Sequence, residues 1–237
     1  MAKVDETISA GNAGWTFADI AESFESHIGR SVPHYDNWHD LICTLSDFFL
    51  PPGACLVYDL GTATGRLARK LLACHADRDE LRLIGVDNVE TMVDNAKRKG
   101  RDDPRGTYVC DDIATFQLEP CSLVTSYYTM QFVHPHFRQD VFDRIYQALN
   151  WGGAFILFEK VRGPDARFQD YMSQVYMDFK LENGFSEEEI IHKSRSLKGV
   201  QEPFSTQGNL DLLHRAGFVD VMTVAKWACF EGWLAIK

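Results

Sequence analysis

The chain has 237 residues, with 34 Asp and Glu against 24 Lys and Arg, and its formal net charge at pH 7 is −10. This length suits one sizeable domain with a full hydrophobic core and is short for two. The acidic balance argues against a general nucleic-acid or anionic-membrane surface, because clustered Lys and Arg bind phosphate groups. No stretch reaches the roughly 18 apolar residues of a membrane span, and the start has no signal-peptide pattern. We therefore expect a cytoplasmic protein that binds neither nucleic acid nor membrane.

The six cysteines are dispersed and form no Cys-x-x-Cys pair. In a reducing compartment such cysteines are typical small core residues. His134 and His136 flank a proline in "VHPHF", but no third ligand accompanies them. The sequence therefore predicts no metal site.

Helical patterns dominate the first 53 residues. Apolar residues recur at three-and-four spacing across "WTFADIAESFESHIG", residues 15–29, which predicts an amphipathic helix. "RSVPHYD" interrupts it, and residues 37–50 resume the pattern until Pro51-Pro52-Gly53 ends it. We expect residues 1–53 to form a helical cap.

From residue 54 the pattern changes to short β-rich runs alternating with helices. The predicted strands are "ACLVYDL", "LRLIGVD", "TYVCDD", "SLVTSYY" and "AFILFEK", the last entered through a turn at residues 150–153. Strands separated by helices of ten or more residues indicate βαβ units. Residues 54–163 are therefore expected to form a doubly wound α/β core with a mostly parallel sheet.

The last third of the chain begins with two long helical stretches, "DARFQDYMSQVYMDFKLEN" and "SEEEIIHKSRSLKGV". We expect residues 164–217 to form a helical lid or dimerisation segment. Residues 218–237 hold two final runs that can add an antiparallel pair to the sheet and bring it to seven strands. The whole chain, 1–237, is then a single domain.

A glycine turn follows the first predicted strand, in "VYDLGTATG". Gly61 and Gly65 allow positive φ and close approach to a ligand. A dinucleotide fold needs Gly-x-Gly-x-x-Gly and a P-loop needs a lysine after its last glycine, and this turn has neither. In an open parallel sheet this position is a ligand site, and Asp59 at the strand end can accept hydrogen bonds from an ammonium group.

Two further acids follow the next two strands. Asp87 can take both hydroxyls of a ribose, with Asn88 and Met92 beside one face of an adenine. Asp112 can accept from the adenine amino group, with Ile113 packed on the ring. Helix capping is the alternative role for each acid taken alone.

The pattern Asp-x-Gly-x-x-x-Gly with these acids resembles class I S-adenosylmethionine-dependent methyltransferases. The segments "WTF", "RSVPHY", "VYDLG", "TMQF", "IYQALNWGGAFILFEK", "DFK", "NGFSEEEI" and "HRAGF", from residue 15 to about 218, resemble the carboxy-S-adenosylmethionine synthases of tRNA wobble-uridine modification. This resemblance implies a Rossmann-like fold, a homodimer, and conversion of S-adenosylmethionine with prephenate into a carboxylated sulfonium.

The chain differs from that family at three places. It has Thr62-Ala63-Thr64-Gly65 in the turn and Tyr127 where the family has asparagine. The family's carboxylate-binding arginine directly follows a lysine, whereas Ser194 follows the lysine here and Arg195 comes one place later. An arginine suits a carboxylate because its fork binds both oxygens, and a shift of one residue turns a helical side chain by about 100°.

We therefore expect methyl transfer from S-adenosylmethionine to a small-molecule acceptor, with S-adenosylhomocysteine as the other product. Carboxy-S-adenosylmethionine synthesis and non-catalytic binding of the cofactor to stabilise a partner protein are the alternatives. The expected cofactor-binding residues are Tyr35, Asp59, Gly61, Thr62, Ala63, Gly65, Asp87, Asn88, Met92, Asp112, Ile113 and Tyr127.

Substrate-side candidates lie near the strand ends and in the helical segments. Tyr35, by the resemblance, covers the methionine end of the cofactor, and Arg30 and Arg195 are candidates for a substrate carboxylate. His134 is the candidate general base, because imidazole titrates near neutrality, and Tyr127 is a second catalytic candidate. Tyr127 and Tyr128 alternate faces, so only one is expected to line the pocket.

Packing or surface roles are the alternatives for each of these residues. The aromatic residues that could line a lid pocket or pack a core are Tyr171, Tyr176, Phe179, Phe204 and Trp227. Glu159, at the end of a buried strand, is expected to be structural.

Overall fold

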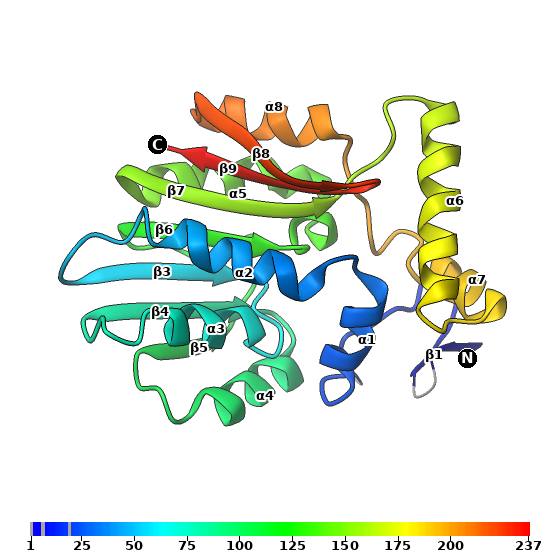
Figure 1. Ribbon diagram of the computed structural model, residues 1–237, viewed down its shortest axis with the longest axis horizontal. Coiled ribbons are helices and arrows are strands. Elements are labelled where there is room, and N and C mark those ends of the chain that lie inside the picture. Colours follow the sequence, from blue (N-terminus) through cyan, green and yellow to red (C-terminus); the bar gives the residue numbers. More distant parts are fainter. Residues whose placement is uncertain (1, 6–7, 19) are drawn as a thin grey trace.

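The computed structural model describes residues 2–5, 8–18 and 20–237 and is built on one large sheet (Figure 1). The strands of this sheet are β3 (Cys55–Leu60), β4 (Leu81–Asp87), β5 (Gly106–Cys110), β6 (Cys121–Tyr127), β7 (Leu149–Lys160), β8 (Asp220–Trp227) and β9 (Phe230–Ile236). Their order is β5-β4-β3-β6-β7-β9-β8. Only the pairings of β9 with β7 and β8 are antiparallel. The doubly wound, mostly parallel sheet of seven strands is confirmed.

Helices cover both faces of this sheet (Figure 1). The helices are α1 (Phe24–Ser31), α2 (Tyr35–Ser46), α3 (Arg66–Cys74), α4 (Glu90–Gly100), the 3-10 turn η1 (Met130–Phe132), α5 (Pro135–Ala148), α6 (Ala166–Glu182), α7 (Glu187–Ser196) and α8 (Thr206–Ala216). Along β7, Ile156 and Phe158 pack with α2, α3 and α4, whereas Phe155 and Leu157 pack with α5 and α8. This alternation follows from the two-residue period of a strand that is buried on both faces.

The strand order places a switch point at β3. The chain runs from β3 outward through β4 to β5, and then returns to pair β6 with the other side of β3. Ligands of open α/β sheets bind in the crevice outside the carboxyl ends of the strands at such a point. The glycine turn that follows β3 lies there.

The first 30 residues differ from the predicted helical cap. Residues Ala2–Asp5 (β1) and Ile8–Ala10 (β2) form a small antiparallel sheet that contacts α7. The helix expected over residues 15–29 begins only at Phe24; before it, the chain forms turns in which Ile20 N bonds to Phe17 O. Trp15, Ile20 and Phe24 pack with this small sheet, so their apolar spacing reflects a local core rather than one continuous helix. Position 19 of that predicted helix lies outside the described residues.

The turn expected at residues 150–153 is instead the irregular beginning of β7. The pairing of β6 with β7 shifts register between Cys121 and Leu123. Gly152 has φ +81°, and its N–H donates to the carbonyl of Lys237 at 2.8 Å. The glycines therefore bend the strand without ending it, as in a β-bulge.

The helices α6 and α7 stand at one end of the sheet, and α7 lies beside β1 (Figure 1). Asp165 caps α6, and Ser186 and Glu189 form a capping box on α7. Apolar side chains on α6 remain exposed: Phe168, Tyr171, Val175, Met177 and Leu181. Among the described helices, none is both long and apolar enough to cross a membrane.

Candidate active site

The turn between β3 and α3 has the backbone conformation that its glycines predict. Gly61 and Gly65 have φ of +79° and +73°, and Ala63 between them has φ +47°. The N–H groups of Gly61 and Thr62 both donate to the carbonyl of Val86. A Cβ on Gly61 would lie 2.0 Å from Oγ1 of Thr129, so the turn has no room for a side chain there.

Asp59 is buried directly beneath this turn. Its carboxylate accepts hydrogen bonds from the hydroxyl of Thr62 at 2.8 Å and from the hydroxyl of Thr125 at 2.9 Å. Burial raises the pKa of Asp59 to about 6, although the two hydroxyl groups act to lower it. Asp59 therefore ties the turn to β3 and β6 and still forms part of the wall of the cavity described below.

Asp87 connects the end of β4 to the same turn. Its Oδ2 accepts from the N–H of Ala63 at 2.9 Å and its Oδ1 from the N–H of Val89 at 3.0 Å. Burial raises the pKa of Asp87, and these backbone bonds act against that rise. Asn88 and the buried Met92 line the cavity beside it.

The third acid has a different position. Asp112 is exposed, and its Oδ1 accepts from the N–H of Ala114 at 2.9 Å, which stabilises the loop after β5. Ile113 is buried in the sheet core. Neither residue belongs to the described lining of the cavity, and their adenine-binding role stays a prediction.

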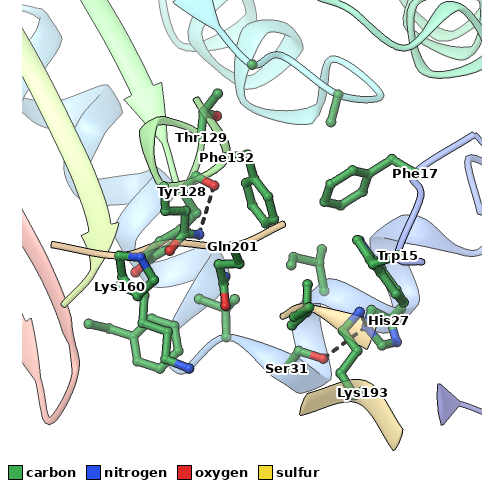
Figure 2. A pocket seen from close by; sticks show the side chains of 18 of the residues that line it. Trp15, Phe17, His27, Ser31, Tyr128, Thr129, Phe132, Lys160, Lys193 and Gln201 are labelled. Carbon is green, nitrogen blue, oxygen red and sulfur yellow. Dashed lines mark hydrogen bonds between the residues drawn. The ribbon is translucent and has the colours of Figure 1, made fainter. Parts of the chain in front are cut away.

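A cavity of about 830 Å³ opens from the glycine turn and extends toward α6 and α7. Its volume lies within the range of small-molecule sites, about 300–1,000 Å³. Aromatic side chains line its middle, among them Trp15, Phe17 and Phe132 (Figure 2). The site is therefore larger than the turn alone and has an apolar wall beyond it.

Three tyrosines gather where β6 ends. The hydroxyl of Tyr127 donates to the carbonyl of Tyr35 at 2.9 Å, and the two rings are 5.1 Å apart. Both Tyr127 and Tyr128 line the cavity, so the expectation that only one does is wrong. The reason is that Tyr128 has φ +59°, which ends the alternation of the strand and turns its side chain to the same side.

Several buried polar atoms that line the cavity have no hydrogen-bond partner among the residues that the structure describes. They are Nε1 of Trp15, both ring nitrogens of His39, the hydroxyl of Tyr128 and Oε1 of Gln131. Buried polar groups are normally paired, and an unpaired one costs free energy. A polar ligand in this cavity would supply partners, and S-adenosylmethionine, with its ribose hydroxyls, ammonium and carboxylate, has groups of that kind.

Cationic side chains line the far part of the cavity. The Nζ atoms of Lys160 and Lys180 lie 4.4 and 4.5 Å from the ring centroid of Tyr176. Burial lowers the pKa of Lys160, and it lowers that of Lys180 to about 8. Lys193 and the exposed Arg195, both on α7, also line the cavity.

Two predicted substrate residues lie apart from the described lining. Arg30 pairs with Asp5 and stacks over the ring of Phe185. His134 is the N-cap of α5, where its Nδ1 accepts from the N–H of His136 at 3.2 Å. The structure thus places the candidate general base at a helix end.

Some of the remaining sequence candidates line the cavity and others do not. Of the five aromatic residues proposed for a lid pocket, only Tyr176 belongs to the described lining; Phe179 packs against Trp227 instead. Glu159 is structural, as expected: it is buried and accepts from the N–H of Met130 at 2.9 Å.

Sequence reasoning missed a polar group on the far wall. His27, Ser31 and Lys193 face the same part of the cavity from α1 and α7 (Figure 2). His27 also contacts Asp5 of β1. No local spacing could have found this group, because Lys193 and His27 are 166 residues apart in the chain.

The comparisons with known proteins agree with this geometry. A family model described as a methyltransferase domain matches residues 57–153. A putative O-methyltransferase from Nostoc punctiforme aligns with a TM-score of 0.64 at 13% identity, over 93% of this chain and 59% of that one. The apo methyltransferase SibL aligns with a TM-score of 0.60 at 16% identity, over 84% of this chain and 54% of that one. The fold is that of the class I S-adenosylmethionine-dependent methyltransferases.

Curated relatives define the family more narrowly. A carboxy-S-adenosyl-L-methionine synthase from Staphylococcus epidermidis is 36% identical over 225 residues, covering 94% of this chain and 97% of the relative. One from Campylobacter lari is 35% identical, covering 93% of each. The chain belongs to the carboxy-S-adenosyl-L-methionine synthase family, a family of enzymes that use S-adenosylmethionine.

Proposed function

We propose that the protein transfers a methyl group from S-adenosylmethionine to a small-molecule acceptor. The observation that carries this proposal is the continuity of the cavity, which runs from the glycine turn after β3 to the aromatic wall beneath α6 and α7. A ligand on the turn would leave the aromatic part for a second molecule. In such a reaction the enzyme contributes mainly by holding the two reactants in line.

The contacts of the turn residues support the cofactor roles proposed for them. Asp59 braces the turn, and Asp87, which lies beside Asn88 and Met92 at the strand end, is proposed to bind the ribose hydroxyls. Tyr35 and Tyr127 form an aromatic wall at the methionine end. We propose that Asp112 and Ile113, in the loop after β5, contact the adenine.

Carboxy-S-adenosylmethionine synthesis is the second candidate. The names of the curated relatives favour it, and so do Lys160, Lys193 and Arg195 on the cavity wall, since these cations suit a carboxylated product. The absence of an arginine at position 194 and the presence of Tyr127 favour ordinary methyl transfer. Arg195 also lines the cavity, where it can serve a substrate carboxylate.

One experiment separates the two candidates. The purified protein is incubated with S-adenosylmethionine and prephenate, and in parallel with S-adenosylmethionine and a panel of phenols, amines and thiols. We expect S-adenosylhomocysteine to form with a member of the panel. A sulfonium heavier by the mass of CO₂ in the prephenate reaction would overturn methyl transfer in favour of the second candidate.

A non-catalytic role has its own signature. A protein that only binds the cofactor to stabilise a partner would bind S-adenosylhomocysteine, form no product in either reaction and co-purify with a fixed partner protein.

We also propose that two copies associate through α6. The exposed apolar side chains of this helix support the proposal, because large apolar patches on soluble proteins mark interaction sites. Replacing Tyr171 and Val175 by Glu should convert a dimer to a monomer in light scattering coupled to size exclusion. An unchanged mass would contradict this interface.

A cytoplasmic location is likewise a proposal. All six cysteines of the chain are free thiols in the structure, which suits a reducing compartment. Fractionation of source cells with an antibody to the chain tests it.

A further inference from the structure

A second polar centre lies on the cavity wall between α1 and α7. His27 Nδ1 contacts the carboxylate of Asp5, and His27 Nε2 lies 3.2 Å from Nζ of Lys193 and 3.3 Å from Oγ of Ser31. His27, Ser31 and Lys193 line the cavity (Figure 2). Asp5 and His27 are almost fully buried, whereas Lys193 is half-buried. We call these four side chains the lysine relay.

The contacts fix the direction of the hydrogen bonds in the lysine relay. A carboxylate only accepts, so Nδ1 of His27 carries the proton and donates it to Asp5. Nε2 is then the acceptor nitrogen of a neutral imidazole, and it accepts from the N–H of Lys193 or the O–H of Ser31. Asp5 thereby holds His27 in the tautomer that receives a hydrogen bond from Lys193.

The surroundings of Lys193 favour its neutral amine, which is the form that can accept a proton. Its Nζ lies against the face of Trp15 at 2.7 Å from the ring centroid. Burial lowers the pKa of Lys193 well below the ordinary lysine value; the charge of Lys180 lowers it further, and that of Asp5 opposes both. Once protonated, Lys193 has the face of Trp15 and Nε2 of His27 to stabilise its ammonium.

His27 and His134 are poorer candidates than Lys193 for the proton acceptor. Burial lowers the pKa of His27 in spite of the neighbouring carboxylate of Asp5, so its imidazole binds a proton only weakly. His134 caps α5. A general base works best with a pKa near the operating pH, which buried lysines can reach.

We infer that Lys193 Nζ is the proton acceptor for a hydroxyl or amine acceptor molecule, with His27 and Asp5 as positioning residues. This inference rests on the proposed methyl transfer. Trp15 lies against Lys193, and Phe17 and Phe132 continue this aromatic wall (Figure 2), which favours a phenol as the acceptor class.

The proton transfer balances as follows. Bound S-adenosylmethionine supplies a methyl carbon that leaves sulfur, with the electron pair staying on sulfur, as the acceptor oxygen bonds to it. The O–H bond of the acceptor breaks, its electron pair stays on oxygen, and the lone pair of Lys193 Nζ takes the proton. The resulting ammonium donates to Nε2 of His27 until the proton passes to water.

The first test measures the titration of Lys193 directly. The full chain is labelled with carbon-13 at lysine Cε, and the signal of Lys193 is assigned by its loss in Lys193→Met. We expect this signal to titrate at lower pH than the main group of lysine signals, and the control Lys97→Met, on the exposed face of α4, to leave it in place. Titration of Lys193 with the main group would overturn the inference.

The positioning role of Asp5 has its own readout. In Asp5→Asn we expect the titration of Lys193 to move to still lower pH, because the lost charge had favoured the ammonium. His27→Gln serves as the second variant if Asp5→Asn fails to fold. An unchanged titration in a folded variant would overturn the positioning role.

Binding of S-adenosylhomocysteine, measured by calorimetry, separates this inference from the proposed function. We expect the wild type and Lys193→Met to bind it equally. If the wild type does not bind it, the proposed function fails, whereas the titration of Lys193 is measured without any cofactor. If a folded Lys193→Met alone loses binding, Lys193 is a cofactor ligand and the inference is overturned. With a phenol that the panel identifies, Lys193→Met should lower the rate about a hundredfold or more, as expected for loss of a general base.

Discussion

The carboxylate of Asp87 accepts a hydrogen bond from the backbone N–H of Ala63 at 2.9 Å, and so joins the end of β4 to the glycine turn after β3. The second oxygen of Asp87 holds the N–H of Val89 at the start of α4. One acid thus fixes two loops of the proposed cofactor site relative to each other.

Replacing Asp87 by Ala should weaken binding of S-adenosylhomocysteine at least tenfold. A hydrogen bond to a charged group contributes about 1.5–3 kcal/mol, and Asp87 would lose those to the turn together with those proposed to the ribose. Calorimetric titration measures the change. Asp102→Asn, at an exposed surface acid, is the control and should bind like the wild type. Equal affinities for Asp87→Ala and the wild type would show that Asp87 does not contribute to cofactor binding.

Gly61 and Gly152 form a matched pair for testing the crowding of the turn. Both have similar positive φ, but a Cβ on Gly61 would overlap Thr129 whereas a Cβ on Gly152 would meet nothing within 4 Å. Gly152→Ala should cost only the left-handed strain, about 1–2 kcal/mol. Gly61→Ala should lower the thermal unfolding temperature further and abolish cofactor binding. Similar unfolding temperatures for the two variants would contradict the crowding.

Glu159 should make the protein less stable as the pH rises. Burial raises its pKa from 4.5 to about 8, even though Arg138 and the backbone N–H of Met130 lower it. At pH values between 4.5 and about 8, Glu159 keeps its proton in the folded state but has released it in the unfolded state. The free energy of unfolding therefore decreases as the pH rises, by up to about 1.4 kcal/mol per pH unit.

Glu159→Gln removes this titration while keeping an oxygen for the N–H of Met130. Urea unfolding at pH 6, 7 and 8 should therefore show a flatter slope in Glu159→Gln than in the wild type. The exposed Glu182→Gln is the control and should keep the wild-type slope. Parallel slopes for the wild type and Glu159→Gln would show that Glu159 does not titrate in this range.

Two roles have been considered for His134: the N-cap of α5 and the general base. As the N-cap of α5 it should contribute about 1 kcal/mol to stability, so we expect His134→Ala to unfold more easily and to retain turnover. The control His136→Ala removes a side chain but leaves the backbone donor of that cap. A loss of turnover without a loss of stability in His134→Ala would instead support the catalytic role expected from the sequence.

Local signals in the sequence were sufficient for the scaffold of the site. The change at residue 54 from helical patterns to short β-rich runs alternating with helices located the sheet, and the glycine spacing predicted the positive φ of Gly61 and Gly65. The acids at the strand ends were found in the same way, because parallel strands bring their carboxyl ends to one edge. Each of these features depends on residues that are neighbours in the chain.

Tertiary structure decided the remainder of the cavity. Tyr128 adopts φ +59° at the end of β6, where its N–H bonds to the carbonyl of Phe158, so two adjacent tyrosines face one side. The lysine relay joins β1, α1 and α7, and no periodicity in the chain reports a contact between Asp5 and His27 or between His27 and Lys193.

Features that depend on residues close together in the chain could be predicted, whereas features that depend on residues far apart in the chain could not. Backbone geometry and the alternation of apolar residues are set within a few positions, so the sequence by itself determined the α/β sheet, the glycine turn and the acids Asp59 and Asp87. Proximity across more than a hundred residues is set by how the small β1–β2 sheet and α7 pack against the cavity. Only the folded structure shows that His27 and Lys193, rather than His134, meet on its wall.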